Sequence, residues 1–379
     1  MKNKLLAFLL YLCVLPFSGA AQTEAFTPAA EEVRGAWLAT VAGLDWPCVD
    51  DQAIIQQIRL VEQIRGLRET GCNTLYFQVV SNMDALYPSR LLPWSAVLTG
   101  TEGRNPGYDP LAIAVRTAHE CGMQIHAWIN PLRVCRDDVT PHAESHVSIS
   151  HPQWVQNYRH KLYLDPGNPE VVDFLAQIAT EILASYDVDG LHIDDYFYPE
   201  GLQKDDNGWR NDMYETYGKG QKLDEWRFST INNVVATLCS ATHSAGSHLV
   251  FGVSPSGRLV NTCRLYADPR MWVNEGTVDY LAPQIYWAIG RSDAAAFDLV
   301  LDSWRFIAKG VPVYVGLAAY KYYGKTTEQD APYISLSEFR REIDLCRQAW
   351  YVKGHIWFRT ENILQDEFKA YILSELYSD

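Results

Sequence analysis

The hydrophobic pattern of the chain repeats one unit eight times from residue 33 onward. Each unit begins with a short apolar run, continues through a polar segment, and ends with a longer stretch in which apolar residues recur every three or four positions. The first long stretch places Ile54, Ile58, Val61, Ile64 and Leu67 at this spacing, which predicts a helix with one buried face. Strands alternating with such helices indicate a parallel sheet covered by helices.

Eight such units favour closure of the sheet into a (β/α)8 TIM barrel over an open sheet. No Gly-x-Gly-x-x-Gly motif follows the first strand, which argues against a dinucleotide-binding fold. The predicted strands are 33–40, 74–80, 124–130, 190–194, 249–254, 280–286, 313–318 and 354–358, and the predicted helices are 51–69, 110–120, 169–185, 223–244, 269–274, 293–308, 336–349 and 361–376.

The connections between these elements differ in length according to their direction. Those that lead from a helix to the next strand are a few residues each, whereas several that lead from a strand to a helix are long. The long connections are 81–109, 131–168, 196–222 and 319–335. All of them leave the C-terminal ends of the strands, so the sequence predicts a cleft built from long βα loops on that face of the barrel.

The N-terminus has the pattern of a signal peptide. Lys2 and Lys4 precede an apolar run over 5–17, and small residues follow at 18–21. We therefore predict a signal peptide over 1–21, a linker over 22–32 and the barrel over 33–379. Cys13 follows the bulky Tyr11 and Leu12, which argues against lipoprotein anchoring. No later run is long enough for a membrane span, and we expect an exported protein, either periplasmic or extracellular.

Composition narrows the class of function. The formal net charge of −14 argues against a nucleic-acid partner, which would require a basic face. Removal of the signal peptide leaves seven of the eight cysteines, an odd number, and no Cys-x-x-Cys pair is present. We therefore predict buried free thiols, no metal ion and no cofactor. The 12 Trp and 22 Tyr residues are consistent with an aromatic-lined groove.

The fourth predicted strand carries the strongest functional signal. Its apolar run ends in two adjacent carboxylates, Asp194 and Asp195, which three aromatic residues follow. Buried carboxylates are costly unless they are partnered or used in catalysis, and catalytic groups of a barrel lie at this end of its strands. The alternative is a solvated Asp pair that opens a surface loop. We predict that Asp194 and Asp195 are catalytic.

Other strand ends supply polar and aromatic side chains to the same face. Side chains alternate along a strand, so His126, Trp128 and Asn130 share one side, and His192 shares a side with Asp194. The alternatives are hydrogen-bonded interior histidines, aromatic packing, and arginines paired with nearby carboxylates. The predicted substrate-binding residues are Trp128, Asn130, Arg133, Asp165, His192, Tyr196, Gln284, Tyr286, Trp287 and Arg359.

Acids, amides and aromatics at a barrel mouth fit the hydrolysis of a glycosidic bond. This reaction usually needs two carboxyl groups at a set separation, one of them with a raised pKa. Neighbours along a straight strand diverge, so either the chain turns after Asp194 or a carboxylate from another loop takes part. Asp165, Glu361 and Asp45 are the candidates, and Glu361 is the third predicted catalytic residue, although it can equally begin the last helix.

Several longer motifs carry a family resemblance. They are Glu-Val-Arg-Gly-Ala-Trp-Leu-Ala-Thr at 32–40, Asp-Trp-Pro at 45–47, His-Ala-Trp-Ile-Asn-Pro-Leu-Arg at 126–133, Leu-Asp-Pro-Gly at 164–167, and the segment 190–199. With them the chain resembles the bacterial glycosyl-hydrolase-like family-ten barrels over essentially its whole mature length. The resemblance implies a (β/α)8 fold, an envelope location and glycoside hydrolysis, with peptidoglycan glycan strands as the best-supported substrate class among relatives.

A looser similarity links the fourth strand to chitinase-type barrels, which carry Asp-Gly-x-Asp-x-Asp-x-Glu there. Aligning Asp189 with the first Asp places His192 and Asp194 on the second and third, and Tyr196 on the catalytic Glu. The acid is missing, so that mechanism does not carry over intact. One hypothesis is that Asp194 and Tyr286 orient a substrate N-acetyl group as nucleophile while Asp195 is the general acid.

Three hypotheses follow. The first is an exported glycoside hydrolase that acts on an N-acetylated polysaccharide, with peptidoglycan glycan as its partner and no prediction for protein partners. The second is a non-catalytic barrel that only binds glycan. The third is a metal-dependent hydrolase that uses His126, His192 and Asp194, although the first strand lacks the His-x-His that barrel metallohydrolases usually show.

Overall fold

The computed structural model describes residues 32–202, 208–324 and 328–377, which belong to one compact unit that begins at Glu32. The predicted signal peptide and all but the last residue of the predicted linker lie outside the described residues.

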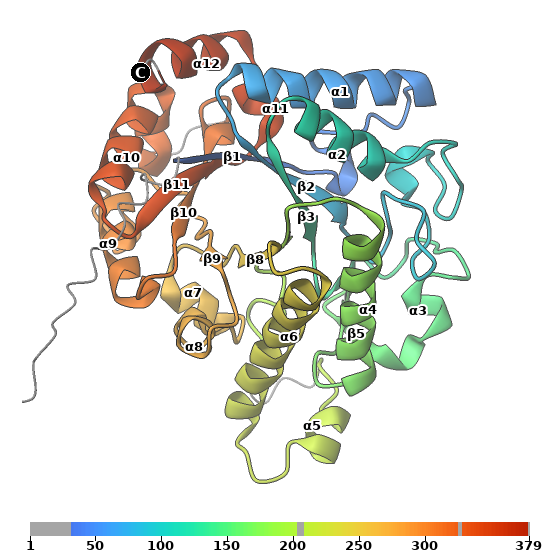
Figure 1. Cartoon of the computed structure of the whole chain (residues 1–379). Helices are drawn as coiled ribbons and strands as arrows, with labels where there is room; N and C mark the ends of the chain where they lie inside the picture. The colour runs from blue at the N-terminus through green and yellow to red at the C-terminus, as the bar shows by residue number, and fades with distance from the viewer. Residues whose placement is uncertain (1–31, 203–207, 325–327, 378–379) are drawn as a thin grey trace, which may run out of the picture. The chain divides into compact units, whose positions relative to one another are not determined.

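Eight parallel strands close into a barrel in the order β1-β11-β10-β9-β8-β7-β3-β2 (Figure 1). The barrel predicted from the hydrophobic pattern is therefore confirmed. Its strands are β1 (Val33–Leu38), β2 (Thr74–Val80), β3 (Gln124–Ile129), β7 (Gly190–Ile193), β8 (Val250–Val253), β9 (Tyr280–Leu281), β10 (Val313–Leu317) and β11 (Val352–Trp357).

Helices surround these strands on the outside of the barrel (Figure 1). The starts of two of them follow from local sequence, because Asp109 and Asn168 cap the helices and a proline follows each. The Asp109 carboxylate accepts a hydrogen bond from the Ala112 amide at 3.0 Å. The helices are α1 (Ala53–Glu69), α2 (Pro110–Glu120), α4 (Pro169–Ser185), α6 (Leu223–Ala245), α8 (Pro269–Glu275), α9 (Phe297–Ala308), α10 (Ser337–Gln348), α11 (Thr360–Ile363) and α12 (Asp366–Tyr371).

The structure corrects three predicted elements. The last predicted helix is divided into α11, α12 and a π-helical turn over Ile372–Leu376, because the backbone of Gln365 is extended. Strand β9 ends at Leu281 and not at Tyr286, because Pro283 has no amide hydrogen to continue the ladder. Helix α9 begins at Phe297, four residues later than predicted.

The connection 131–168, predicted as a loop, contains a small antiparallel sheet. Its strands β4 (Arg133–Cys135), β5 (Val155–Tyr158) and β6 (Lys161–Leu164) lie in the order β4-β6-β5. The short helix α3 (Val147–Ser150) lies between β4 and β5, and short helices α5 (Asp212–Tyr217) and α7 (Leu259–Arg264) occur in later loops. This accessory sheet contributes to the cleft described below.

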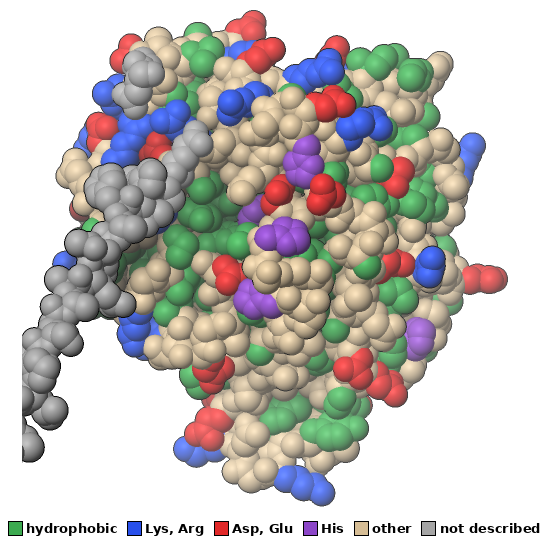
Figure 2. Space-filling view, in the orientation of Figure 1, with side chains coloured by type: hydrophobic (Ala, Val, Ile, Leu, Met, Phe, Trp, Pro, Cys, Tyr) green, Lys and Arg blue, Asp and Glu red, His purple; other side chains and the backbone are tan. Residues whose placement is uncertain are grey.

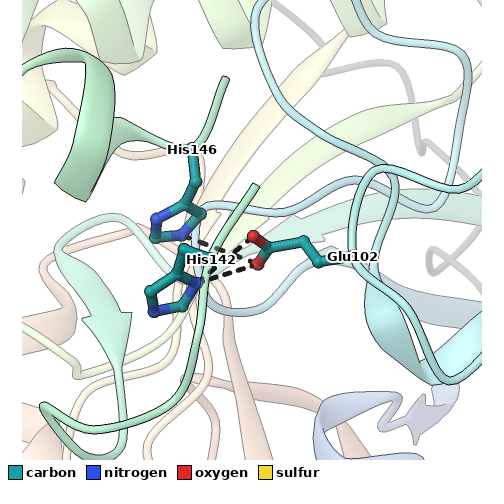
Figure 3. Close-up of side chains that lie close together, drawn as sticks. All are labelled: Glu102, His142 and His146. Atoms are coloured by element: carbon teal, nitrogen blue, oxygen red, sulfur yellow. Dashed lines mark hydrogen bonds and ion pairs between the residues drawn. The ribbon is translucent and has the colours of Figure 1, made fainter. Parts of the chain in front are cut away.

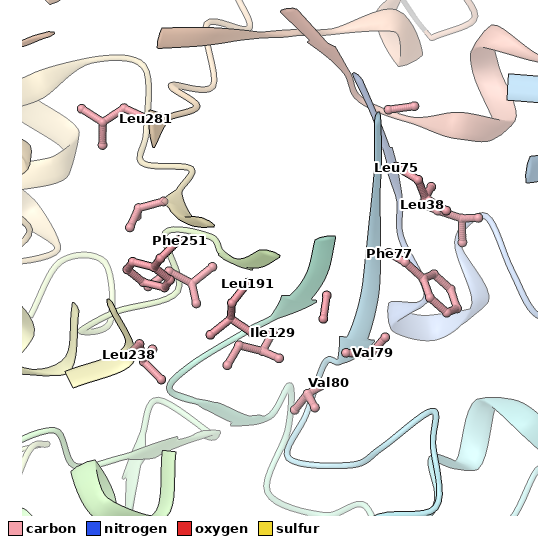
Figure 4. Close-up of a cluster of buried hydrophobic side chains, with 14 of the residues drawn as sticks. Leu38, Leu75, Phe77, Val79, Val80, Ile129, Leu191, Leu238, Phe251 and Leu281 are labelled. Atoms are coloured by element: carbon pink, nitrogen blue, oxygen red, sulfur yellow. The ribbon is translucent and has the colours of Figure 1, made fainter. Parts of the chain in front are cut away.

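Alternation along the strands separates two apolar layers. Leu75 and Phe77 of β2 point toward the helices and belong to the large outer core, part of which Figure 4 shows. Tyr76, between them, points into the barrel, where Trp37, Trp128 and other side chains form a separate cluster. Large aromatic side chains therefore fill the barrel interior in place of the branched aliphatic residues that dominate many barrels.

Surface charge, helix hydrophobicity and the state of the cysteines can be compared with the sequence predictions. On the face shown in Figure 2, Lys and Arg side chains lie among acidic ones and form no continuous basic patch. No helix in the described part of the chain is long and apolar enough to cross a membrane. The seven cysteines from Cys48 to Cys346 are free thiols, and four of them are buried.

Candidate active site

A cavity of about 200 Å³ lies at the C-terminal ends of the barrel strands. It contains seven of the residues predicted from the strand ends, which come from β3, β4, the end of β7, and the segment that follows β9. The lining residues are Trp37, Ala39, Val41, Leu44, Gln78, Trp128, Arg133, Asp194, Asp195, Tyr196, Ser254, Gln284, Tyr286 and Phe358.

Asp194 follows β7 directly, and its side chain is 3% exposed. The indole Nε1–H of Trp128 donates a hydrogen bond to its Oδ2 at 3.1 Å. Burial raises the pKa of Asp194 to about 8, and the neighbouring charge of Asp195 adds to this effect. The positive charge of Arg133 and the Trp128 hydrogen bond act in the opposite direction but do not cancel it.

Asp195 is more open than Asp194 and is only half-buried. The Gln284 amide Nε2 donates a hydrogen bond to its Oδ1 at 3.3 Å, and the same amide donates to the Ser254 carbonyl at 3.1 Å. Burial raises the pKa of Asp195 to about 6, against the lowering effect of the Gln284 hydrogen bond. The two adjacent carboxyl groups therefore retain a proton near neutral pH, which a general acid requires.

Arg133 belongs to the accessory sheet, and its guanidinium lies in the cavity wall. Its Nε–H donates to the Ser81 carbonyl at 3.0 Å, and its Cζ lies 4.0 Å from the centre of the Tyr196 ring. The buried atoms Arg133 Nη2 and Ser254 Oγ have no hydrogen-bond partner among the described residues. Buried polar atoms are rarely left unpaired, so both are available to a ligand in this cavity.

A chain of hydrogen bonds lies inside the barrel. Trp37 Nε1–H donates to His192 Nε2 at 3.0 Å, so this nitrogen carries no proton and His192 Nδ1–H donates to the Tyr280 hydroxyl at 2.9 Å. The Tyr280 hydroxyl also contacts His126 Nδ1 at 2.8 Å. Burial lowers the pKa of both histidines, that of His126 to about 4.

This hydrogen-bonded chain corrects the prediction that His192 binds substrate. His192 is completely buried, and protein groups occupy both of its ring nitrogens. The same contacts remove His126 and His192 as a pair of metal ligands beside Asp194, because three of their four ring nitrogens already bond to Trp37 or Tyr280. Both histidines therefore contribute hydrogen bonds that link the side chains inside the barrel.

Gln78 of β2 is a cavity residue that the sequence analysis missed. Its Oε1 accepts hydrogen bonds from the amides of Thr40 and Val41, each at 2.9 Å, and its Nε2 donates to Asn130 Oδ1 at 3.0 Å. An amide within the otherwise apolar run of β2 was the available signal. Asn130, predicted to bind substrate, is completely buried and holds Gln78 from behind without lining the cavity.

Two further predicted residues lie outside the cavity. The Asp165 carboxylate accepts hydrogen bonds from Gln156 Nε2 at 2.7 Å and from the Gly167 amide at 2.9 Å, and so fixes the turn that precedes α4. Trp287 packs against the outer core. Neither residue lines this cavity, and the Asp165 carboxylate is already bonded within its own turn, so the structure corrects the prediction for Asp165. The binding of substrate by the partly buried Trp287 stays a prediction.

Arg359 and Glu361 line an adjoining hollow and not the cavity itself. The Arg359 guanidinium contacts Glu361 Oε2 at 2.8 Å and Asp45 Oδ1 at 2.9 Å. The charges of Arg359 and Glu361 are therefore paired within this local network. Glu361 is half-exposed at the start of α11. The prediction that Glu361 supplies a catalytic carboxylate beside Asp194 is corrected by this position.

Glu102, His142 and His146 lie together in the loops that follow β2 and β3 (Figure 3). Glu102 Oε1 is 3.1 Å from His142 Nδ1, and the two imidazole rings are stacked with centroids 3.9 Å apart and planes 6° apart. A metal ion binds imidazole in the ring plane, and two parallel stacked planes do not meet at one ion. His146 Nε2 also contacts the Asn82 carbonyl at 3.0 Å. His142 and His146 form a His-x-x-x-His spacing, which corrects the expectation that the sequence contains none. Their stacked rings fit hydrogen bonding between two loops and not a shared metal ion.

Comparisons with known proteins agree with this architecture. The family model of glycosyl hydrolase-like 10 matches residues 32–335. The chain is 35% identical over 399 aligned residues to the glycosyl hydrolase YngK of Bacillus subtilis (strain 168), with 97% of this chain and 75% of that protein covered. It is 34% identical over 390 residues to the glycosyl hydrolase DigH of Escherichia coli (strain K12), with 92% and 87% covered.

Among solved structures, the fold is similar to the glycoside hydrolase domain of PgaB (BpsB) from Bordetella bronchiseptica. The TM-score is 0.54 at 12% identity, and the match covers 85% of this chain and 94% of that one. This similarity concerns the fold alone. The family match and the two bacterial relatives confirm the predicted family and the predicted enzyme class of glycoside hydrolases. The chain belongs to the glycosyl hydrolase-like 10 family.

Proposed function

We propose that the protein is an exported glycoside hydrolase that cleaves an N-acetylated polysaccharide, with peptidoglycan glycan strands as its substrate. The observation that carries this proposal is the pair Asp194 and Asp195 in one cavity, each with a pKa raised by burial. One group that remains protonated near neutral pH beside a second carboxyl group is the requirement for acid-catalysed glycoside cleavage.

Asp195 is the proposed general acid. It is the more exposed carboxyl group, Gln284 fixes one of its oxygens, and it lies where the cavity opens into a neighbouring hollow. In that position it can protonate the oxygen of the leaving sugar. Asp194 lies deeper, and Trp128 holds its Oδ2. A proton shared by the pair therefore leaves through Asp195.

The nucleophile is proposed to be the substrate's own acetamido group. Asp194 and Asp195 are the only acidic side chains among the described residues that line the cavity. Asp194 is buried and its Oδ2 accepts the Trp128 hydrogen bond, so we assign it to orienting the substrate and not to attack on the anomeric carbon. The acetamido oxygen would attack the anomeric carbon as Asp195 protonates the leaving oxygen. Asp194 and Tyr286 would hold the acetamido group in this position. Water then opens the cyclic intermediate and returns the proton to Asp195.

The remaining cavity residues suit a sugar that carries a carboxylate. Arg133 offers a guanidinium edge, Ser254 offers a hydroxyl, and Tyr196 is 43% exposed and offers a ring face to a sugar. A chain of net charge −14 would otherwise repel a carboxylate, so the Arg133 guanidinium in the cavity wall favours a ligand of negative charge. The lactyl carboxylate of a muramic unit is a ligand of this chemistry, which supports peptidoglycan over a neutral glycan.

The proposal is tested by incubating the purified protein with intact and with peptide-stripped peptidoglycan, and with chitin oligomers as a neutral N-acetylated control. Released sugars are identified by mass spectrometry. We expect new reducing ends from N-acetylated glycan. Binding to the glycan without any release of reducing ends would contradict the proposal and support a barrel that only binds glycan.

A further inference from the structure

The cavity that holds Asp194 continues into a second hollow of about 470 Å³. Asp195, Tyr196 and Gln284 line both spaces, so the proposed general acid lies at their junction. A substrate bound in the cavity therefore has room to extend past Asp195. Beyond its opening beside Asp195, this second hollow has no ligand in the proposed function.

The outer wall of the second hollow is the hairpin formed by β5 and β6. Tyr158, Arg159, Lys161 and Tyr163 of this hairpin face the hollow. Aromatic rings and cationic side chains together suit a sugar that carries a carboxylate. Lys161 makes no ion pair with another described residue in the structure, and the acids Asp195 and Glu200 also line this hollow.

The hairpin is held firmly in place. Its turn requires left-handed backbone at Arg159 (φ 50°) and His160 (φ 62°), as in a tight two-residue hairpin turn. The Tyr158 hydroxyl donates to the Gly201 carbonyl at 3.2 Å, and Gln156 Nε2 donates to Asp165 at 2.7 Å. The hairpin is therefore a fixed wall, tied to the loop after β7.

The accessory sheet joins this wall to the cavity. Tyr163 of β6 is the register partner of Arg133 of β4. Tyr163 lines the second hollow together with Asp195 and Tyr196. One small sheet thus carries a cationic group into the cavity and an aromatic group into the second hollow.

The cavity also continues on its other side. A third hollow of about 600 Å³ shares Leu44 and Phe358 with the cavity, and Tyr320 and Tyr323 lie in its wall. Aromatic side chains therefore lie along the barrel mouth on both sides of the Asp pair. A pocket built to hold only the terminal sugar of a chain would be closed on one side.

We propose that a glycan chain runs across the barrel mouth from the hollow beside Tyr320, past Asp195, to the β5–β6 hairpin, and that the protein cuts within the chain. The hairpin is the binding arm for a carboxylate-bearing sugar on the leaving side of the bond. This inference rests on the proposed function and adds the direction of the substrate, the mode of cleavage and the residues that select chain length.

Binding to the arm is measured first, in an Asp195→Asn background, so that the result does not depend on hydrolysis. Peptide-free glycan chains of two to eight sugars are titrated by calorimetry against this protein and against the same protein with Tyr163→Ala. We expect affinity to rise with length until both sides are filled, and Tyr163→Ala to lower the affinity of long chains about tenfold while two-sugar affinity changes little. Lys353→Ala, an exposed lysine on β11, is the matched control and should change neither.

Cleavage mode is measured on long glycan strands with the unaltered protein. We expect the mean chain length to fall before single sugars or disaccharides accumulate. Release of only terminal units from the first time point would overturn the inference, as would an equal loss of affinity at all lengths in Tyr163→Ala. If length-dependent binding is found but no reducing ends form, the result supports the hairpin as a glycan-binding arm and contradicts the proposed hydrolysis.

Discussion

The indole of Trp128 donates its Nε1–H to Asp194 Oδ2 at 3.1 Å, across the seam between β3 and β7. Trp128 pairs in register with His192, two residues before Asp194, and its indole reaches the Asp194 carboxyl group from the neighbouring strand. The carboxyl group loses water through burial, and it accepts this hydrogen bond on Oδ2 and a longer one from the Tyr196 amide, at 3.4 Å, on Oδ1. The Trp128 hydrogen bond therefore lowers the pKa of Asp194, as the charge of Arg133 and the Tyr196 amide also do, against the larger effect of burial.

Replacement of Trp128 with Phe keeps most of the ring packing and removes the donor. A hydrogen bond to a carboxylate favours its charged form, so its loss raises the pKa of Asp194 further above about 8. We expect the alkaline limb of the kcat/KM profile to move to higher pH, and kcat to fall about tenfold. The measurement is a pH–rate profile on a soluble glycan. An unchanged alkaline limb would show that this bond does not tune the pair.

Replacement of Asp194 with Asn is expected to stabilise the fold at neutral and alkaline pH. The folded state holds the Asp194 proton more tightly than the unfolded state, because the pKa rises from its ordinary value of 3.8 to about 8. The folded state therefore loses stability as pH rises from about 4 to 8, and an amide does not share this loss. We expect a gain in unfolding free energy of about 1 to 3 kcal/mol at pH 8, less than the full shift implies because water enters the cleft.

This gain is measured by urea unfolding at pH 4.5 and pH 8. Asn retains an acceptor for the Trp128 indole, so packing is conserved. The gain should be much smaller at pH 4.5, because this position is uncharged in both folded proteins and pH 4.5 is close to the ordinary pKa of 3.8. A variant that is equally destabilised at both pH values would contradict the assigned burial of charge.

Replacement of Gln78 with Met is expected to destabilise the cleft wall. The change removes the acceptor for the amides of Thr40 and Val41, both of which are buried, and the donor to Asn130. A buried donor left without a partner costs about 1 to 3 kcal/mol. We expect a loss of 2 to 4 kcal/mol in urea unfolding, on the order of two unpaired groups, together with weaker glycan binding. Gln57→Met, on the exposed face of α1, is the control and should change stability by less than about 0.5 kcal/mol.

Much of the fold was accessible from the sequence because its signals are local. The predicted bounds of β2, α2 and α4 agree with the structure at both ends, since caps, prolines and apolar periodicity mark them. The inward side of β3 and β7 followed from alternation alone. The accessory sheet was missed because its strands are three or four residues long and lie inside a loop of mixed composition.

The candidate site was only partly accessible for a related reason. Asp194 and Asp195 follow β7 directly and Tyr286 lies in the segment after β9, and these segments meet because the ends of the barrel strands converge. Whether an inward side chain lines the cavity or lies in the sealed interior depends on its depth along the strand. The alternation of apolar and polar residues gives the side of the strand but not this depth. His192 and Asp194 share a side, yet one lies in the sealed interior and the other lines the cavity. Arg359 pairs with Asp45 and Glu361, an alternative that the sequence pattern offered but could not decide.

The central claim is that Asp195 delivers the proton that breaks a glycosidic bond. It is tested most directly by measuring the release of reducing ends from peptide-free peptidoglycan by the unaltered protein and by Asp195→Asn, with the Tm of each protein as the folding control. We expect Asp195→Asn to lower kcat by a factor of about 100 to 10,000 while its Tm stays within a few degrees of the unaltered protein. Equal rates of release from two equally folded proteins would contradict the claim.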